Sequence, residues 1–152
     1  MNALICDGEV AERLEAGQEG EIILSTTPFY AEMGGEVGDT GIIFAGESVA
    51  RVLDTKAPEA GLTVHKVKIE SGSFSVGEEV TASVDAKRRA SIARNHTCTH
   101  ILHAALREVL GAHVKQAGSY VGPDRLRFDF THFAAVTAEQ LTQVERVANE
   151  FI

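Results

Sequence analysis

The chain has 152 residues, of which 44% are hydrophobic, and a formal net charge of −8. This composition predicts one globular domain or two small subdomains with a buried core, and it excludes a largely disordered chain. No stretch approaches the ~20 apolar residues needed to cross a bilayer, and no signal peptide pattern is present. Two cysteines are too few for a disulfide scaffold and are typical of a reducing compartment. We therefore expect a cytoplasmic location and no membrane partner.

Residues 1–86 are predicted to form a small antiparallel, β-barrel-like subdomain. Short runs rich in β-branched residues alternate there with glycine, proline and acidic turns. The expected strands are 21–26, 41–45, 49–53, 62–69 and 79–84. In the fourth run the alternation buries Val64 and, after a change of phase, Val67 and Ile69. His65 is therefore expected to face solvent.

Residues 87–152 are predicted to form an α/β subdomain with a long helix packed on an antiparallel sheet. Apolar residues recur there at intervals of three and four up to Gly111, which indicates a helix of about six turns. Two strands are expected next, at 113–121 and 125–131, joined by a glycine–proline turn. A second helix begins after Thr137, which forms a capping box with Gln140. The expected fold class is α+β.

Charge is unevenly divided along the chain. Residues 1–85 carry a net charge of −11, residues 86–127 a net +6 and residues 128–152 a net −3, counted from the sequence. The basic residues of the middle segment are Lys87, Arg88, Arg89, Arg94, Arg107, Lys115, Arg125 and Arg127. Such a block can bind phosphates in an otherwise acidic chain, or it can be the solvated face of a helix.

The spacing of the histidines is the first indication of a chemical function, namely metal binding. His96 and His100 are four residues apart on the long helix, so both imidazoles can face one metal ion. His103 shares their stripe, and any two of the three could chelate, whereas Cys98 projects about 200° away from His96. The zinc-protease pattern His-Glu-x-x-His is excluded because position 97 is Thr97. Two ligands are half of a zinc site, since such sites use three or four protein donors.

Beyond this spacing, two longer motifs carry a resemblance. The first is Arg94-Asn95-His96-x-x-x-His100-Ile101-Leu102-His103-Ala104-Ala105-Leu106-Arg107, continuing through Gln116-x-Gly118-Ser119 to Leu126-Arg127-Phe128-Asp129-Phe130-x-His132. It closely resembles the editing domain of alanyl-tRNA synthetases. The second, the glycine-rich stretch from Thr27 to Gly41, is similar to a motif that this domain shares with free-standing alanyl editing proteins. Threonyl editing domains also have His-x-x-x-His, but the glycine motif favours the alanyl family.

The resemblance implies an activity and a cofactor. It implies hydrolysis of tRNA(Ala) mischarged with serine or glycine, within a larger enzyme that joins alanine to tRNA(Ala) using ATP and Mg. His96 and His100 would be zinc ligands, and the other ligands would come from a Cys-x-x-x-His element farther along the family's chain. That element is absent from the 152 residues. We therefore expect a fragment, cut within or just after the Thr137 helix, with an incomplete zinc site and little or no activity by itself.

If the chain has this function, the chemistry of its residues suggests candidates for substrate and tRNA binding. They are Thr27, Gly34, Gly35, Glu36, Arg94 and Gln116. The hydroxyl of Thr27, or of its neighbour Thr26, or the amide of Gln116 could recognise the side chain of serine. Gly34 and Gly35 could shape the edge of the tRNA site or only permit positive φ in a tight loop.

Glu36 departs from the family, which commonly has Gln at this position. A carboxylate near a tRNA end adds repulsion where an amide would donate a hydrogen bond, so the sequence names Glu36 as a candidate for binding but leaves its role open. The sequence also assigns no catalytic residue.

The alternative function is a non-catalytic module that binds the tRNA acceptor stem, with an acidic β-subdomain and a basic helix. Either function makes tRNA the partner, and no DNA partner is expected. A cysteine and a histidine four residues apart farther along the parent chain would favour the hydrolase.

Overall fold

The computed structural model describes residues 1–151, which form two compact units. The first unit comprises residues 1–33 and 37–89. The second comprises residues 34–36 and the chain from residue 90 onward. The short glycine-rich segment 34–36 thus belongs to the unit formed mainly by residues far from it in sequence.

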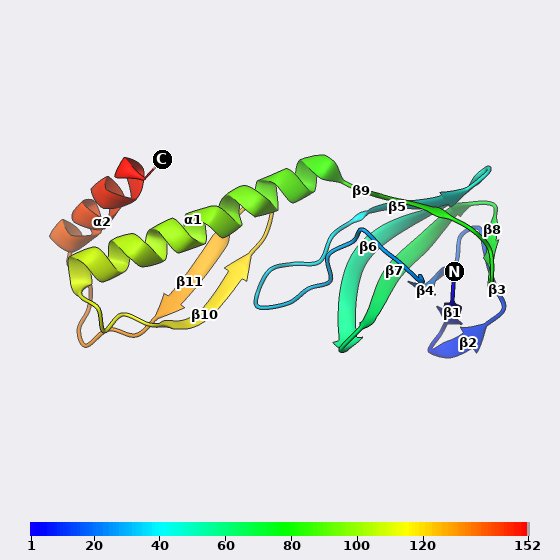
Figure 1. The fold of residues 1–152 in the computed structure, drawn as a ribbon, viewed down its shortest axis with the longest axis horizontal. Coiled ribbons are helices and arrows are strands. Elements are labelled where there is room, and N and C mark those ends of the chain that lie inside the picture. The colour runs from blue at the N-terminus through cyan, green and yellow to red at the C-terminus, as the bar shows by residue number, and fades with distance from the viewer. Residues whose placement is uncertain (152) are drawn as a thin grey trace. The chain divides into compact units, whose positions relative to one another are not determined.

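The first unit is built on a seven-stranded antiparallel sheet in the order β2-β1-β4-β7-β6-β5-β9 (Figure 1). The strands of this unit are β1 (Ala3–Cys6), β2 (Glu9–Ala11), β3 (Arg13–Glu15), β4 (Glu19–Ile23), β5 (Gly41–Ala45), β6 (Ser48–Glu59), β7 (Leu62–Ser71), β8 (Ser73–Ser75) and β9 (Thr81–Val84). Strands β3 and β8 form a separate antiparallel pair. Across residues 1–151 the edge strands β2 and β9 do not pair, so the sheet does not close into a barrel.

The core of this unit draws on nearly every strand. Leu4 of β1, Leu14 of β3, Ile22 of β4, Ile69 of β7 and Phe74 of β8 are each fully buried and pack in one hydrophobic cluster. Burying an aliphatic or aromatic side chain of this size stabilises the fold by roughly 1.5–3 kcal/mol. The short strands β1, β3 and β8, which the sequence patterns did not reveal, therefore supply much of this core.

His65 contradicts its sequence-based expectation, because it is fully buried rather than turned to solvent. The register between β6 and β7 shifts between Val52 and Asp54, so one residue of β6 has no direct partner. The shift lies beside the change of phase in β7, where Val64 and His65 are buried in succession. Within β7 itself, His65 is buried in step with Val67 and Ile69, so the expectation was wrong because it took the phase of the strand from Val64.

The second unit packs helices on a two-stranded sheet. Its elements are α1 (Ala86–Leu110), whose first turn belongs to the first unit, β10 (Gln116–Val121), β11 (Leu126–Phe130) and α2 (Ala138–Glu150). Ala105 and Leu106 of α1 pack with Val144 and Val147 of α2, and Phe128 of β11 lies against this cluster. The expected capping box at the start of α2 is confirmed. The α+β class is likewise confirmed.

Candidate functional site

His96 and His100 lie one turn apart on α1 and face each other. Their Nε2 atoms are 3.1 Å apart, and their ring centroids are 4.9 Å apart. Tetrahedral zinc with Zn–N bonds of about 2.0–2.1 Å separates two ligand nitrogens by roughly 3.3 Å. The donor atoms of this pair are therefore already spaced to suit one metal ion.

Glu36 lies at the other nitrogen of His96. Its Oε2 is 2.5 Å from His96 Nδ1, and its side chain is 21% exposed. Because a carboxylate only accepts, the hydrogen-bond pattern assigns a proton to Nδ1 of His96. Nε2 of a neutral His96 then carries a lone pair directed at His100.

The segment Gly34–Glu36 is held against β10 by its backbone. Val121 N donates to Gly35 O at 2.8 Å, and Ser119 Oγ donates to Gly34 O at 3.2 Å. Glu36 forms a parallel β-bridge with Val121. Gly35 has a φ of +86°, and a Cβ there would lie 2.2 Å from the carbonyl oxygen of Ser119. Glycine is therefore required by both conformation and space, as one of the two sequence-based readings expected.

The third histidine of the stripe is placed differently. His103 packs against Phe128, with ring centroids 5.0 Å apart, and its buried Nε2 has no hydrogen-bond partner among residues 1–151. Tertiary packing thus separates His103 from the pair. Within the same described range, no group of three or more His, Cys, Asp or Glu side chains is arranged to hold a metal ion.

Thr27 belongs to the first unit, where the core uses its hydroxyl. His65 Nδ1 donates to Ile22 O at 2.8 Å, so Nε2 is an acceptor and takes the single proton of Thr27 Oγ1, also at 2.8 Å. Thr27 Oγ1 in turn accepts from Phe29 N at 3.2 Å. Burial lowers the pKa of His65, which favours this neutral form.

Two further candidates lie in the second unit. Gln116 Nε2 donates to Ser119 Oγ at 3.1 Å, which connects it to the residue that holds Gly34. Arg94 donates to Ser91 Oγ at 2.9 Å. Asn95, which the sequence left without a role, donates to Gly122 O at 2.8 Å and so joins α1 to the turn between β10 and β11.

Several residues of the basic block serve the structure. Arg88 donates to Gly38 O at 2.8 Å, and Arg89 forms an ion pair with Asp39, whose side chain is 5% exposed. The Asp39 carboxylate beside it raises the pKa of Arg89. In the second unit, Arg127 pairs with a neighbouring carboxylate at 3.1 Å. These three guanidinium groups therefore already have protein partners, which favours the structural interpretation of these residues over phosphate binding.

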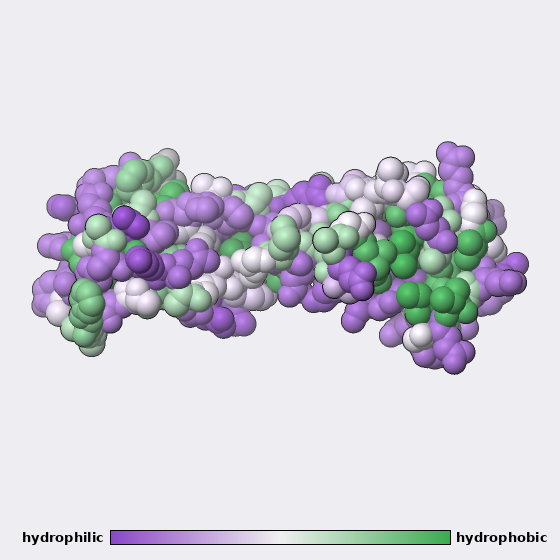
Figure 2. All heavy atoms as spheres, turned by 60° about the horizontal axis from the view of Figure 1, so that its bottom comes forward, coloured by the Kyte–Doolittle hydropathy of each residue, from purple (hydrophilic) through white to green (hydrophobic). Residues whose placement is uncertain are grey.

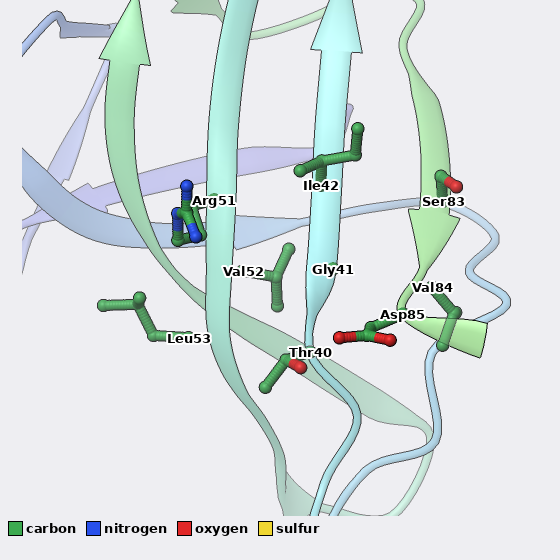
Figure 3. Close-up of a pocket in the computed structure, with 9 residues that line it drawn as sticks. All are labelled: Thr40, Gly41, Ile42, Arg51, Val52, Leu53, Ser83, Val84 and Asp85. Atoms are coloured by element: carbon green, nitrogen blue, oxygen red, sulfur yellow. The ribbon is translucent and has the colours of Figure 1, made fainter. Parts of the chain in front are cut away.

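A surface pocket of about 500 Å³ lies in the first unit, between β6, β5 and β9 (Figure 3). It contains none of the candidate residues. Its two charged side chains have structural partners, because Arg51 donates to Glu70 at 2.5 Å and Asp85 accepts from Arg88 N at 2.9 Å at the start of α1. The pocket therefore offers little chemistry of its own.

Hydrophobic clusters stand among hydrophilic side chains on the face drawn in Figure 2. The most exposed large apolar side chains are Phe133, at 87%, and Val10, at 84%. None of the helices described within residues 1–151 is long and apolar enough to cross a membrane.

Comparison with known proteins shows the family of this chain. Residues 1–88 match the family model described as tRNA synthetases class II (A). The chain belongs to this synthetase family. It is also 52% identical to an alanine–tRNA ligase of Bordetella petrii over 97% of its length, and 51% identical to that of Roseiflexus castenholzii over its whole length. A ligase of Acetivibrio thermocellus is 52% identical over 98% of the chain.

This synthetase chain spans about 17% of the length of the relatives it matches. The family match covers most of the first unit, whereas the alignments to the ligases extend through the histidine pair and both helices.

Proposed function

We propose that this chain is the histidine-bearing part of the editing domain of an alanyl-tRNA synthetase. The parent enzyme would join alanine to tRNA(Ala) using ATP and Mg at another domain, in the cytoplasm. The editing domain would hydrolyse tRNA(Ala) carrying serine or glycine. The observation that carries this proposal is the 3.1 Å approach of the Nε2 atoms of His96 and His100, in a chain about half identical to alanine–tRNA ligases.

The residues present fit part of a zinc site. His96 and His100 would hold the ion through Nε2, and the remaining donors would come from elsewhere in the parent protein. Zinc supplies a Lewis acid that can polarise an ester carbonyl or lower the pKa of a bound water well below that of free water. His96 and His100 lie on a rigid helix with side chains turned toward each other, which favours binding because little conformational freedom is lost.

A separate editing site is needed because a binding pocket alone discriminates poorly among small amino acids. A pocket for alanine cannot exclude glycine by size, and it rejects serine weakly because that residue adds only one hydroxyl. A second hydrolytic site supplies the missing discrimination.

We propose Gln116 rather than Thr27 as the residue that recognises the hydroxyl of serine. The hydroxyl of Thr27 already donates its one hydrogen to His65. Gln116 lies in the same unit as the histidine pair, and its amide offers both a hydrogen-bond donor and an acceptor. Replacing Gln116 with alanine should lower the ratio of seryl to alanyl ester hydrolysis by the parent enzyme. The variant Thr27→Val should leave that ratio near the wild-type value, and the reverse pattern would contradict this assignment.

The proposed function is tested with the parent enzyme and seryl-tRNA(Ala). Substitutions His96→Ala and His100→Ala should each slow deacylation by about 100-fold or more, because a zinc ligand is lost. His132→Ala is the matched control, since it removes an imidazole from the same unit without touching the pair. Deacylation within twofold of wild type in both ligand variants would refute the proposal.

The separate chain of 152 residues gives a second test. It should bind well under one zinc per chain after purification and hydrolyse seryl-tRNA(Ala) weakly or not at all. Stoichiometric zinc held by these residues alone would contradict an incomplete site. If the parent enzyme binds tRNA(Ala) but never deacylates it, the non-catalytic binding module would replace the hydrolase as the function.

A further inference from the structure

We propose that Glu36 is a positioning residue for His96. Its carboxylate holds His96 in the tautomer with a proton on Nδ1, so that the Nε2 lone pair already points toward His100 before a metal ion arrives. The consequence for metal binding rests on the zinc site proposed above, whereas the tautomer itself does not.

The contacts of His96 define its tautomer. Nδ1 lies 2.5 Å from Glu36 Oε2, and Nε2 lies 3.1 Å from His100 Nε2. The hydrogen bond made by one ring nitrogen determines which nitrogen carries the proton. With Nδ1–H donated to Glu36, His96 Nε2 is an acceptor and His100 Nε2 is the donor of the second hydrogen bond. For both Nε2 atoms to bind one metal ion, the proton of a neutral His100 has to move from Nε2 to Nδ1, whereas a neutral His96 needs no such change.

The position of Glu36 is set by its backbone. The bridge to Val121 and the hydrogen bond from Val121 N to Gly35 O fix the segment on β10, while α1 carries His96. The contact thus joins residues that are 60 positions apart through two separately anchored elements. Such anchoring distinguishes it from a pair of flexible surface charges, which contribute little.

A carboxylate behind a metal-binding imidazole has a known physical effect. It orients the ring, fixes the tautomer and makes the ligand more basic, and its loss typically lowers metal affinity by about 10- to 100-fold. Glutamine at position 36 could still accept the Nδ1 proton through its amide oxygen, but without a negative charge. The variants Glu36→Gln and Glu36→Ala therefore separate orientation from charge.

The experiment compares four forms of the 152-residue chain: wild type, Glu36→Gln, Glu36→Ala and the control Glu108→Gln. Glu108→Gln removes the same charge on α1, eight residues and roughly 12 Å along the helix from His100. The ¹⁵N chemical shifts of the His96 ring in metal-free protein report which nitrogen is protonated. Competition against a chromophoric chelator, carried out with the same four forms of the parent enzyme, reports the Kd for Zn²⁺, and thermal unfolding checks that each variant folds.

In wild type and in Glu36→Gln, His96 should show the Nδ1–H tautomer. In Glu36→Ala that preference should be lost, and the Kd for Zn²⁺ should rise by about 10- to 100-fold. Glu36→Gln should weaken zinc binding less than Glu36→Ala, and Glu108→Gln should stay within twofold of wild type.

An unchanged His96 tautomer in Glu36→Ala would overturn the proposal, as would a zinc affinity in Glu36→Ala within twofold of wild type. Equal, large losses in both Glu36 variants would also overturn it, because they would make Glu36 a direct ligand. If the wild-type parent enzyme binds no zinc through His96 and His100, the proposed zinc site fails, and the metal-free tautomer of the 152-residue chain still decides the role of Glu36.

Discussion

The buried histidine of the first unit predicts a specific dependence of stability on pH. His65 is fully buried, donates from Nδ1 to Ile22 O and accepts at Nε2 from Thr27, so the folded chain holds it neutral. Burial lowers its pKa below the ordinary value for histidine, about 6.5. In the unfolded chain His65 takes up a proton below about pH 6.5, whereas in the folded chain it does so only at a lower pH. Its contribution to stability is therefore complete above that pH and is lost as the pH falls.

The size of this pH effect follows from the uptake of one additional proton by the unfolded chain. Each pH unit between the unfolded and folded pKa values changes the free energy of unfolding by about 1.4 kcal/mol. The variant His65→Gln lacks this titration, although it should be less stable at pH 7.5 because it loses the fit of the imidazole. The gap in stability between wild type and His65→Gln should therefore narrow by up to about 2 kcal/mol from pH 6.5 to pH 5.0.

Urea unfolding of both proteins at pH 7.5, 6.5, 5.75 and 5.0 measures this gap. The other histidines are common to both proteins, so their titration cancels in the difference. An NMR titration of His65 in the folded wild type adds a direct measurement, and its ring should remain neutral at pH 6.5. A gap that stays constant across the series, or a folded His65 that protonates above pH 6.5, would refute the reasoning.

Other substitutions test the packing of each unit. Asp39→Asn should cost about 1–2 kcal/mol in urea unfolding, because it removes the charge of a buried carboxylate that pairs with the partly exposed Arg89, and an unchanged stability would contradict this account. Gly35→Ala should lower the free energy of unfolding by at least about 1 kcal/mol more than Gly34→Ala. Both glycines have positive φ, but only a Cβ at position 35 would clash with a backbone carbonyl, and equal losses in the two variants would contradict such a clash. Thr137→Ala should cost about 1 kcal/mol and reduce amide protection in the first turn of α2, and unchanged protection would argue against the cap.

Local patterns predicted the helices well. The apolar repeat up to Gly111 corresponds to α1, and the capping box at Thr137 corresponds to the start of α2. A helix forms its hydrogen bonds within one segment, so its signals lie within one segment of sequence. The strands at 41–45 and 62–69 were predicted for a similar reason, because each is a local run rich in β-branched residues between turn signals.

The shortest strands could not be predicted in this way. Strands β2, β3 and β8 have three residues each, and β1 has four, too few for a two-residue repeat to stand out. They exist because neighbouring strands pair with them and because Leu4, Leu14 and Phe74 fill the core. His65 was misplaced because Val64 and His65 are both buried, and the phase of β7 was taken from Val64 although His65 is the residue in step with Val67 and Ile69.

The sequence by itself determined that His96 and His100 can face one ion, because helical geometry brings residues four apart onto one face. Only the tertiary structure separated His103 from them, by packing it on Phe128, and only the tertiary structure brought Glu36 to His96. That contact depends on Gly35 lying against β10, far away in the chain. Spacing along one helix is a local property, whereas the surroundings of each imidazole depend on which distant segments fold against it.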